Sequence, residues 1–222
     1  MDGSSRTAQR HLIEAILDNE PERARAALEA GACPRLVDHE DPGLWRLFGF
    51  DHLAGSFLLY EAVTLASKRK NAGDVRLIRV LLQHGARVSQ VDDQGYSAAH
   101  EAAATNQAQA LELLIASDAD VNLRSCKGFT PIHTAIFGNA MPCVKLLLES
   151  GARLELTSHY GKTPLQYAQI LDRKELQGLI EAHMAIRAMQ AITGITGITG
   201  FTGVTGVTCP VGRAPSTDFR PA

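Results

Sequence analysis

The stretch "SCKGFTPIHTAIFGNA", residues 125–140, shares its skeleton with two other parts of the chain. "DDQGYSAAHEAAATNQ" (92–107) begins 33 residues earlier, and "SHYGKTPLQYAQILDR" (158–173) begins 33 residues later. The positions in step include the glycines Gly95, Gly128 and Gly161 and the alanines Ala102, Ala135 and Ala168. A period of this length is typical of stacked repeats, so the sequence predicts an array of similar units.

Each copy can be interpreted as the start of a helix. In the central copy Gly128 allows a turn with positive φ, Thr130 can cap a helix, and Pro131 suits the first helical position because its missing N–H costs nothing there. Asn139 is a residue type that readily ends a helix in the left-handed conformation. Between cap and stop lies an apolar stripe at helical spacing, formed by Ile132, Ala135 and Ile136.

A second helix follows the stop in each copy. It is predicted at "LIRVLLQHGA" (77–86), "LELLIASDA" (111–119) and "VKLLLESGA" (144–152), and it ends in Gly-Ala or in the variant Asp-Ala. The stop positions before these second helices are Asn19, Gly73, Asn106, Asn139 and Asp172. Each unit is therefore expected to run helix, turn, helix, hairpin-like loop.

These residues carry a family resemblance. "KGFTPIHTAI" with "VKLLLESGA", together with "GKTPLQYA" and "DADVN", resembles the ankyrin repeat, whose pattern is G-x-T-P-L-H-x-A-A followed by V-x-x-L-L-x-x-G-A-D-x-N. The resemblance implies an all-α, right-handed helical solenoid of about five repeats in residues 1–190. His100 and His133 fall at the family's histidine position, where the ring braces the adjoining turn.

The expected repeats differ in how well they match the pattern. Those at 92–124, 125–157 and 158–190 match clearly, the one at 51–91 carries an insertion, and the one at 5–37 matches loosely as an N-terminal cap. In the last repeat Gln166 replaces the histidine, and no Gly-Ala pair closes the second helix. Since each repeat contacts only its neighbours and terminal units fray first, we expect the last repeat to open before the central ones.

Two segments depart from the repeat pattern. The insertion at 38–57 contains Trp45 and Phe48, which either fold back onto neighbouring helices or stay exposed as partner anchors. The tail at 191–222 has glycine at every third position from Gly194 to Gly206, which resembles a collagen-like Gly-x-y tract. It lacks proline until Pro210, so disorder is the favoured interpretation, with a self-associating stem and β-aggregation as alternatives.

Composition narrows the classes of partner. The formal net charge is −2 for 222 residues, which gives no electrostatic basis for binding nucleic acid or an anionic membrane. The start of the chain lacks a secretory signal pattern, and no stretch approaches the roughly 20 apolar residues of a membrane span. We therefore expect an intracellular, cytoplasmic monomer. The short basic stretch "SKRK" (67–70) is also compatible with a nuclear location.

No catalytic, cofactor-binding or metal-binding pattern is present. Nucleophile motifs and phosphate-binding loops are absent, and the histidines show no spacing of helical or zinc-knuckle ligands. An enzyme would require polar residues to converge beside the 38–57 insertion, where the candidates are His39, Asp41, Asp51 and His52. The sequence therefore predicts a non-catalytic protein without metal or cofactor.

The resemblance implies that a protein or peptide partner binds the concave face, which is made of loop tips and first helices. Carried over by position, the candidate partner-binding residues are Tyr96, Arg124, Lys127, Phe129, Phe137, His159, Tyr160 and Lys162, with Trp45 and Phe48 from the insertion. Aromatic residues flanked by cations are common interface anchors, although packing between neighbouring loop tips would also account for them. A scaffold, an adaptor and an inhibitor are equally compatible, and the main alternative is a structural protein that self-associates through its tail.

Overall fold

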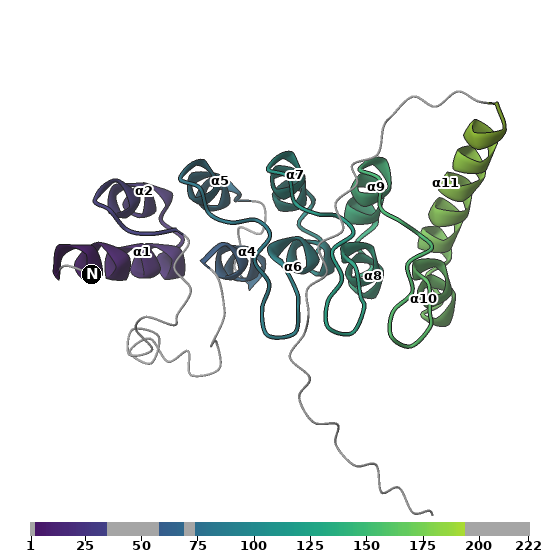
Figure 1. Ribbon diagram of the computed structural model, residues 1–222, viewed down its shortest axis with the longest axis horizontal. Helices are drawn as coiled ribbons and strands as arrows, with labels where there is room; N and C mark the ends of the chain where they lie inside the picture. The colour runs from purple at the N-terminus through teal and green to yellow at the C-terminus, as the bar shows by residue number, and fades with distance from the viewer. Residues whose placement is uncertain (1–2, 35–57, 69–73, 194–222) are drawn as a thin grey trace, which may run out of the picture.

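The computed structural model describes residues 3–34, 58–68 and 74–193 of the chain. Within these ranges the helices follow one another in consecutive pairs, and Figure 1 shows the pairs stacked side by side along the molecule. The 38–57 insertion with Trp45 and Phe48, the helix stop expected at Gly73, and the tail from residue 194 lie outside the described residues.

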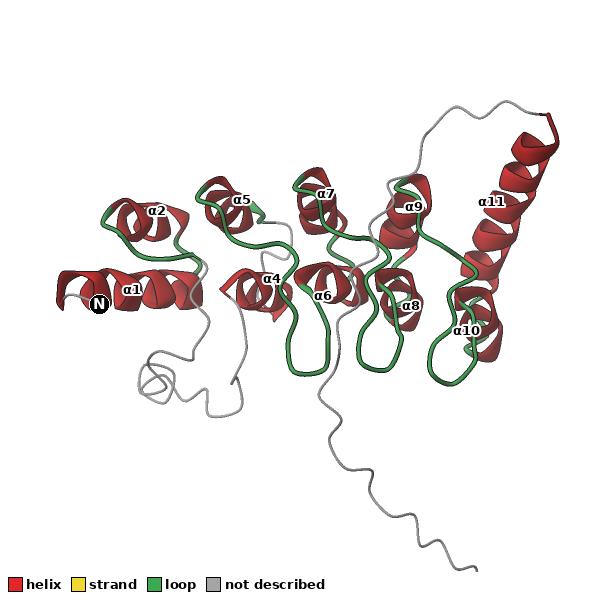
Figure 2. Cartoon of the chain, viewed as in Figure 1, coloured by secondary structure: helices red, strands yellow, loops and turns green. Residues whose placement is uncertain are grey.

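The described helices lie in two rows. The first row contains α1 (Gly3–Asp18), α4 (Leu58–Lys68), α6 (Ala98–Ala104), α8 (Pro131–Phe137) and α10 (Pro164–Ile170). The second row contains α2 (Pro21–Glu29), α5 (Arg76–Gln83), α7 (Ala108–Ala116), α9 (Met141–Glu149) and the long α11 (Lys174–Thr193). Loops join the helices, and the described β-structure is limited to one isolated bridge between Val91 and Ser97 (Figure 2). The expectation of an all-α helical repeat solenoid is confirmed.

A polar residue caps each of three first-row helices in the same way. The backbone N–H of Ser97 donates to Nδ1 of His100 at 3.1 Å, and that of Thr130 donates to Nδ1 of His133 at 3.2 Å. In the last pair the backbone N–H of Thr163 donates to Oε1 of Gln166 at 2.9 Å. These contacts satisfy backbone donors that a helix start would otherwise leave unpaired, which explains why the recurring sequence begins helices.

The predicted helix stops are confirmed where the structure describes them. The backbone takes positive φ angles at Asn19, Asn106, Asn139 and Asp172, at 57°, 58°, 53° and 51°. Asp118, which replaces glycine at the end of a second helix, has a φ of 64°, compared with 86° at Gly151. Asparagine and aspartate tolerate this conformation better than other residues with a Cβ, so each short helix ends at a defined position.

The core lies between the two rows and continues from pair to pair. Ile132, Ile136 and Leu147 are fully buried, as are the small residues Ala102 and Ala135 that let neighbouring first-row helices approach. Gly138 lies against the backbone of α6, because an added Cβ there would overlap the carbonyl oxygen of Ala104. The first-row helices α6 and α8 are thereby held in close contact.

Hydrogen bonds join neighbouring loops, and each bond links residues that lie about one repeat apart in the sequence. The backbone N–H of Cys126 donates to the carbonyl of Gln94 at 2.8 Å, and that of His159 donates to the carbonyl of Lys127 at 2.9 Å. The guanidinium of Arg124 also donates to the carbonyl of Thr157 at 2.7 Å. These bonds hold the loop tips in register along the stack.

Candidate partner-binding face

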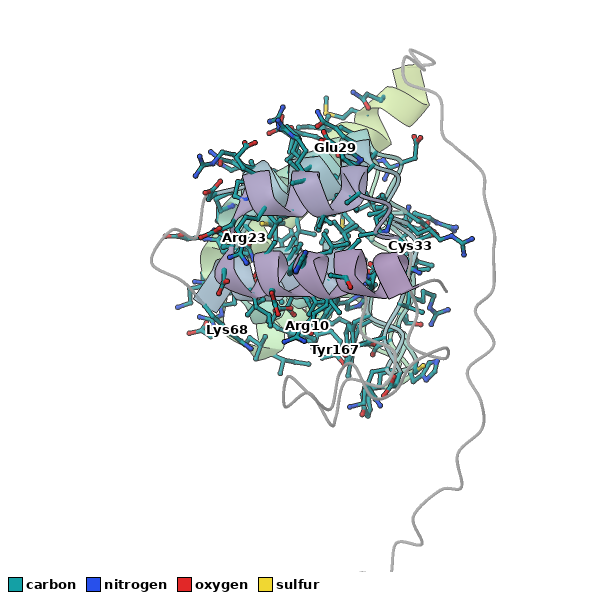
Figure 3. The ribbon with its side chains drawn as sticks, turned by 90° about the vertical axis from the view of Figure 1, so that its left-hand side faces the viewer. Arg10, Arg23, Glu29, Cys33, Lys68 and Tyr167 are labelled. Carbon is teal, nitrogen blue, oxygen red and sulfur yellow. The ribbon has the colours of Figure 1, made fainter. Side chains whose placement is uncertain are left out.

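The first-row helices and the loops before them form one side of the stack, which we call the inner face. Figure 3 looks along the stack, and in this view Lys68 of α4 and Tyr167 of α10 lie on the opposite side of the molecule from Glu29 of α2. The side chains that the first-row helices do not bury between the rows are therefore available on the inner face.

A groove of about 280 Å³ opens on the inner face where three first-row helices meet. Its lining comes from α4, from α6 together with Tyr96 just before the cap of α6, and from α8. The lining residues are Tyr60, Tyr96, His100, Glu101, Ala104, Thr134 and Phe137. The groove therefore combines aromatic walls with a single carboxylate.

Two polar lining residues are already engaged within the fold. Both ring nitrogens of His100 have partners, because Nε2 lies 3.1 Å from the carbonyl oxygen of Phe129 while Nδ1 faces Ser97. The hydroxyl of Thr134 donates to the carbonyl of His100 at 3.0 Å or to that of Pro131 at 2.9 Å. These contacts support the structural role expected for His100. They leave the carboxylate of Glu101 and the hydroxyls of Tyr60 and Tyr96 as the polar groups that could meet a ligand.

Glu101 is a partly desolvated carboxylate. The hydroxyl of Tyr60 lies 3.4 Å from its Oε2, at the long end of hydrogen-bonding distance. Burial raises the pKa of Glu101, and it raises the pKa of the neighbouring Glu61. Burial and the nearby negative charge of Glu101 also raise the pKa of the Tyr60 hydroxyl well above its usual range. The groove is thus electrostatically unfavourable for further negative charge.

An aromatic cluster adjoins the groove between α8 and α10. The rings of Phe137 and Phe129 meet edge to face with centroids 5.1 Å apart, and Phe137 and Tyr167 meet in the same way at 5.1 Å. Phe129 also lies 5.8 Å from the ring of His133 and 6.1 Å from that of Tyr160. The cluster contributes packing between repeats and presents its outer rings on the inner face.

The expected partner-binding residues differ in their exposure. Arg124, Lys127, His159 and Lys162 lie exposed at the loop tips. Tyr160 is 66% exposed and Phe137 is 37% exposed, whereas Phe129 retains only 9% of its surface. Tyr96 is half-buried and packs edge to face on the ring of His100. Phe129 therefore packs beneath the exposed rings instead of presenting its own ring to a partner. Trp45 and Phe48 lie outside the described residues.

Sequence reasoning missed Tyr60, Glu101 and Tyr167. The period does contain a signal for two of them, because Glu101, Thr134 and Tyr167 share one repeat position. That position lies three residues before the one shared by Ala104, Phe137 and Ile170, of which Phe137 is among the candidate partner-binding residues. Residues three apart lie on the same face of a helix. The position of Glu101, Thr134 and Tyr167 therefore belongs to the inner face as well.

The described residues provide no evidence for a metal site or a membrane span. Across residues 3–34, 58–68 and 74–193, no three histidine, cysteine or acidic side chains are placed to hold one metal ion. In those same ranges, no helix is both long and apolar enough to cross a membrane. His39, Asp41, Asp51 and His52, the candidates for an enzyme site, lie outside the described residues.

Consecutive helix pairs with recurring caps, stops and loop-to-loop bonds define a helical repeat protein. A family model described as "Ankyrin repeats (many copies)" matches residues 63–115, and another described as "Ankyrin repeats (3 copies)" matches residues 117–184. Together the two matches span more than half of the chain, and the chain belongs to the ankyrin-repeat family. No curated protein matches it.

Ankyrin repeats generally mediate protein–protein interactions. Both matched models describe these repeats, and neither describes a catalytic domain. Because one repeat fold serves many different proteins, membership of the family does not identify a partner.

Proposed function

We propose that this protein is a non-catalytic interaction module that binds a protein or peptide partner on its inner face. The observation that carries the proposal is the groove between α4, α6 and α8, which continues into the partly exposed aromatic rings of Phe137 and Tyr160. Apolar and aromatic surface beside a few polar groups is the usual composition of a binding site. Scaffold, adaptor and inhibitor roles would all use this surface.

The construction of the inner face supports this role. Hydrogen bonds between neighbouring loops hold the tips of Lys127 and His159 in register, and buried caps fix the first turns of the helices beneath them. A surface that is ordered before binding loses little conformational entropy when a partner docks. Partners of such a surface gain affinity from a few well-placed anchors.

Two exposed aromatic residues allow a direct test. We expect Phe137→Ala and Tyr160→Ala each to weaken binding of peptides selected on the full chain from a random peptide library, by about tenfold or more. Tyr160 is 66% exposed, so its removal should change the melting temperature little. Phe137 packs against Phe129 and Tyr167, so Phe137→Ala should lower the melting temperature, and its peptide affinity is measured well below that temperature. Phe129 is unsuitable for this test, because its burial means that truncation would also destabilise the fold.

Lys145→Ala is the matched control, because Lys145 is exposed on α9 in the second row. It should leave peptide affinity unchanged. The proposal would be wrong if the selected peptides lost affinity with Lys145→Ala while tolerating Phe137→Ala and Tyr160→Ala.

A further inference from the structure

The carboxylates at the groove have no paired cation within the described residues. Glu101 lines the groove, and Glu61 is buried on the preceding helix, α4. Among the residues that the structure describes, no ion pair joins either side chain to lysine, arginine or histidine. The exposed Lys68 at the end of α4 attracts both carboxylates without forming an ion pair. This attraction only partly offsets the rise in their pKa values that burial causes. Within the described residues, the groove therefore holds a carboxylate that no cation contacts directly.

The other walls of the groove suit the same kind of ligand. Tyr96 and Phe137 contribute aromatic rings from two successive repeats, and Tyr60 contributes a third from α4. Lysine and arginine side chains combine an apolar stem with a cationic head, and the faces of aromatic rings attract such heads. An acidic side chain would be repelled by the charge of Glu101, and a purely apolar one would desolvate that carboxylate further without supplying a cation.

We propose that the groove takes one lysine or arginine side chain from an extended segment of the partner, an inference that rests on the proposed function. The cationic head pairs with the carboxylate of Glu101, and the stem packs against Tyr96 and Phe137. Charge complementarity and the aromatic lining select this occupant over an acidic or an apolar anchor.

The surrounding surface limits the partner to one such residue at this place. Further along the stack the exposed loop-tip charges are positive, at Arg124, Lys127 and Lys162. A segment that was basic along its whole length would be repelled by these cations, whereas a segment with a single basic anchor would not. The expected recognition pattern is therefore a basic residue at one fixed position in an otherwise non-basic sequence.

The test uses the full chain and a phage-displayed library of random peptides of about twelve residues. Peptides selected on the wild type should share one lysine or arginine at a fixed position. A synthetic peptide of the selected sequence should bind Glu101→Gln about tenfold more weakly than the wild type, since a charge-assisted contact is lost. Glu112→Gln makes the same chemical change at an exposed position on α7 and should leave affinity unchanged.

The last comparison uses a peptide in which glutamine replaces the basic residue of the parent peptide. It should bind the wild type about tenfold more weakly than the parent peptide does. It should also bind the wild type and Glu101→Gln equally, which would attribute the lost affinity to the pair formed by Glu101 and the basic residue of the peptide. The peptide exchange on the wild type decides the question even if Glu101→Gln fails to fold.

Two different failures can be distinguished. Peptides that lose affinity with Phe137→Ala but share no basic position would overturn the basic anchor while leaving the proposed function standing. Equal affinity of the parent peptide for wild type and Glu101→Gln would overturn it as well. Selected peptides that are indifferent to both Phe137→Ala and Tyr160→Ala would overturn the proposed function together with this inference.

Discussion

His100 and His133 hold the first turns of α6 and α8 as neutral rings. In each, Nδ1 accepts from the backbone N–H of the capping residue, and Nε2 faces a carbonyl oxygen of the next loop, that of Phe129 or Lys162. A carbonyl oxygen only accepts hydrogen bonds, so the proton of each ring sits on Nε2. A second proton would remove the acceptor that the cap needs.

This arrangement predicts a pH-dependent stability. Burial lowers the pKa of both rings from the usual 6.5 to about 4. Between these values the unfolded chain binds protons that the folded chain excludes, so the free energy of unfolding should fall as the pH drops from about 6.5 to about 4. The expected loss is about 3 kcal/mol for each histidine, measured by denaturant unfolding at a series of pH values.

The chain itself suggests the control. Gln166 makes the equivalent capping contact without a titrating ring, so His133→Gln keeps a side-chain acceptor for the N–H of Thr130. The stability advantage of the wild type over this variant should shrink by about 3 kcal/mol between pH 7 and pH 4. An advantage that stays constant over this range would show that burial does not suppress protonation of His133.

At the scale of helices, the sequence predicted best what depends on neighbouring residues along the chain. Caps at Thr130 and stops at Asn139 and Asp172 are confirmed because turn and cap chemistry acts over a few residues. The groove was not predicted as a unit, because its walls come from three helices whose side chains meet only after stacking. For the same reason the sequence placed Phe129 at a loop tip but left open whether its ring anchors a partner or packs between neighbouring tips, and the structure buries it among other rings.

The last pair of helices differs from the central ones in ways that should affect its local stability. α8 buries six of its residues, whereas α10 buries only Pro164 and Ala168. Ile170 of α10 is 61% exposed, and the capping Gln166 is exposed where the central repeats have a buried histidine. Fewer buried contacts lower the free energy needed for local opening.

Native-state hydrogen exchange should therefore report faster exchange in the last repeat. We expect backbone amides of α10 to be less protected than those of α8, with the segment 158–185 opening before the segment 125–157. Because both helices have seven residues, their length does not bias the comparison. Equal or greater protection of 158–185 would contradict the expected order of opening.

At the scale of the whole molecule, stacking creates the inner face that we propose as the binding surface. Each helix pair buries apolar side chains against its neighbours, and the same repetition aligns loops and first-row helices into the continuous inner face (Figure 1). The negative groove at α4 and α6 and the positive loop tips at Arg124, Lys127 and Lys162 then occupy different positions along one surface. A partner could use both only by lying along the stack.

The most direct test of this account is paramagnetic line broadening in the full chain on adding a selected peptide that carries a nitroxide spin label. The account predicts that amide signals of residues 96–104 and 131–137 broaden most, because these segments border the groove. Signals of α5, α7 and α9 in the second row should change least. Strongest broadening in those second-row helices would contradict binding on the inner face.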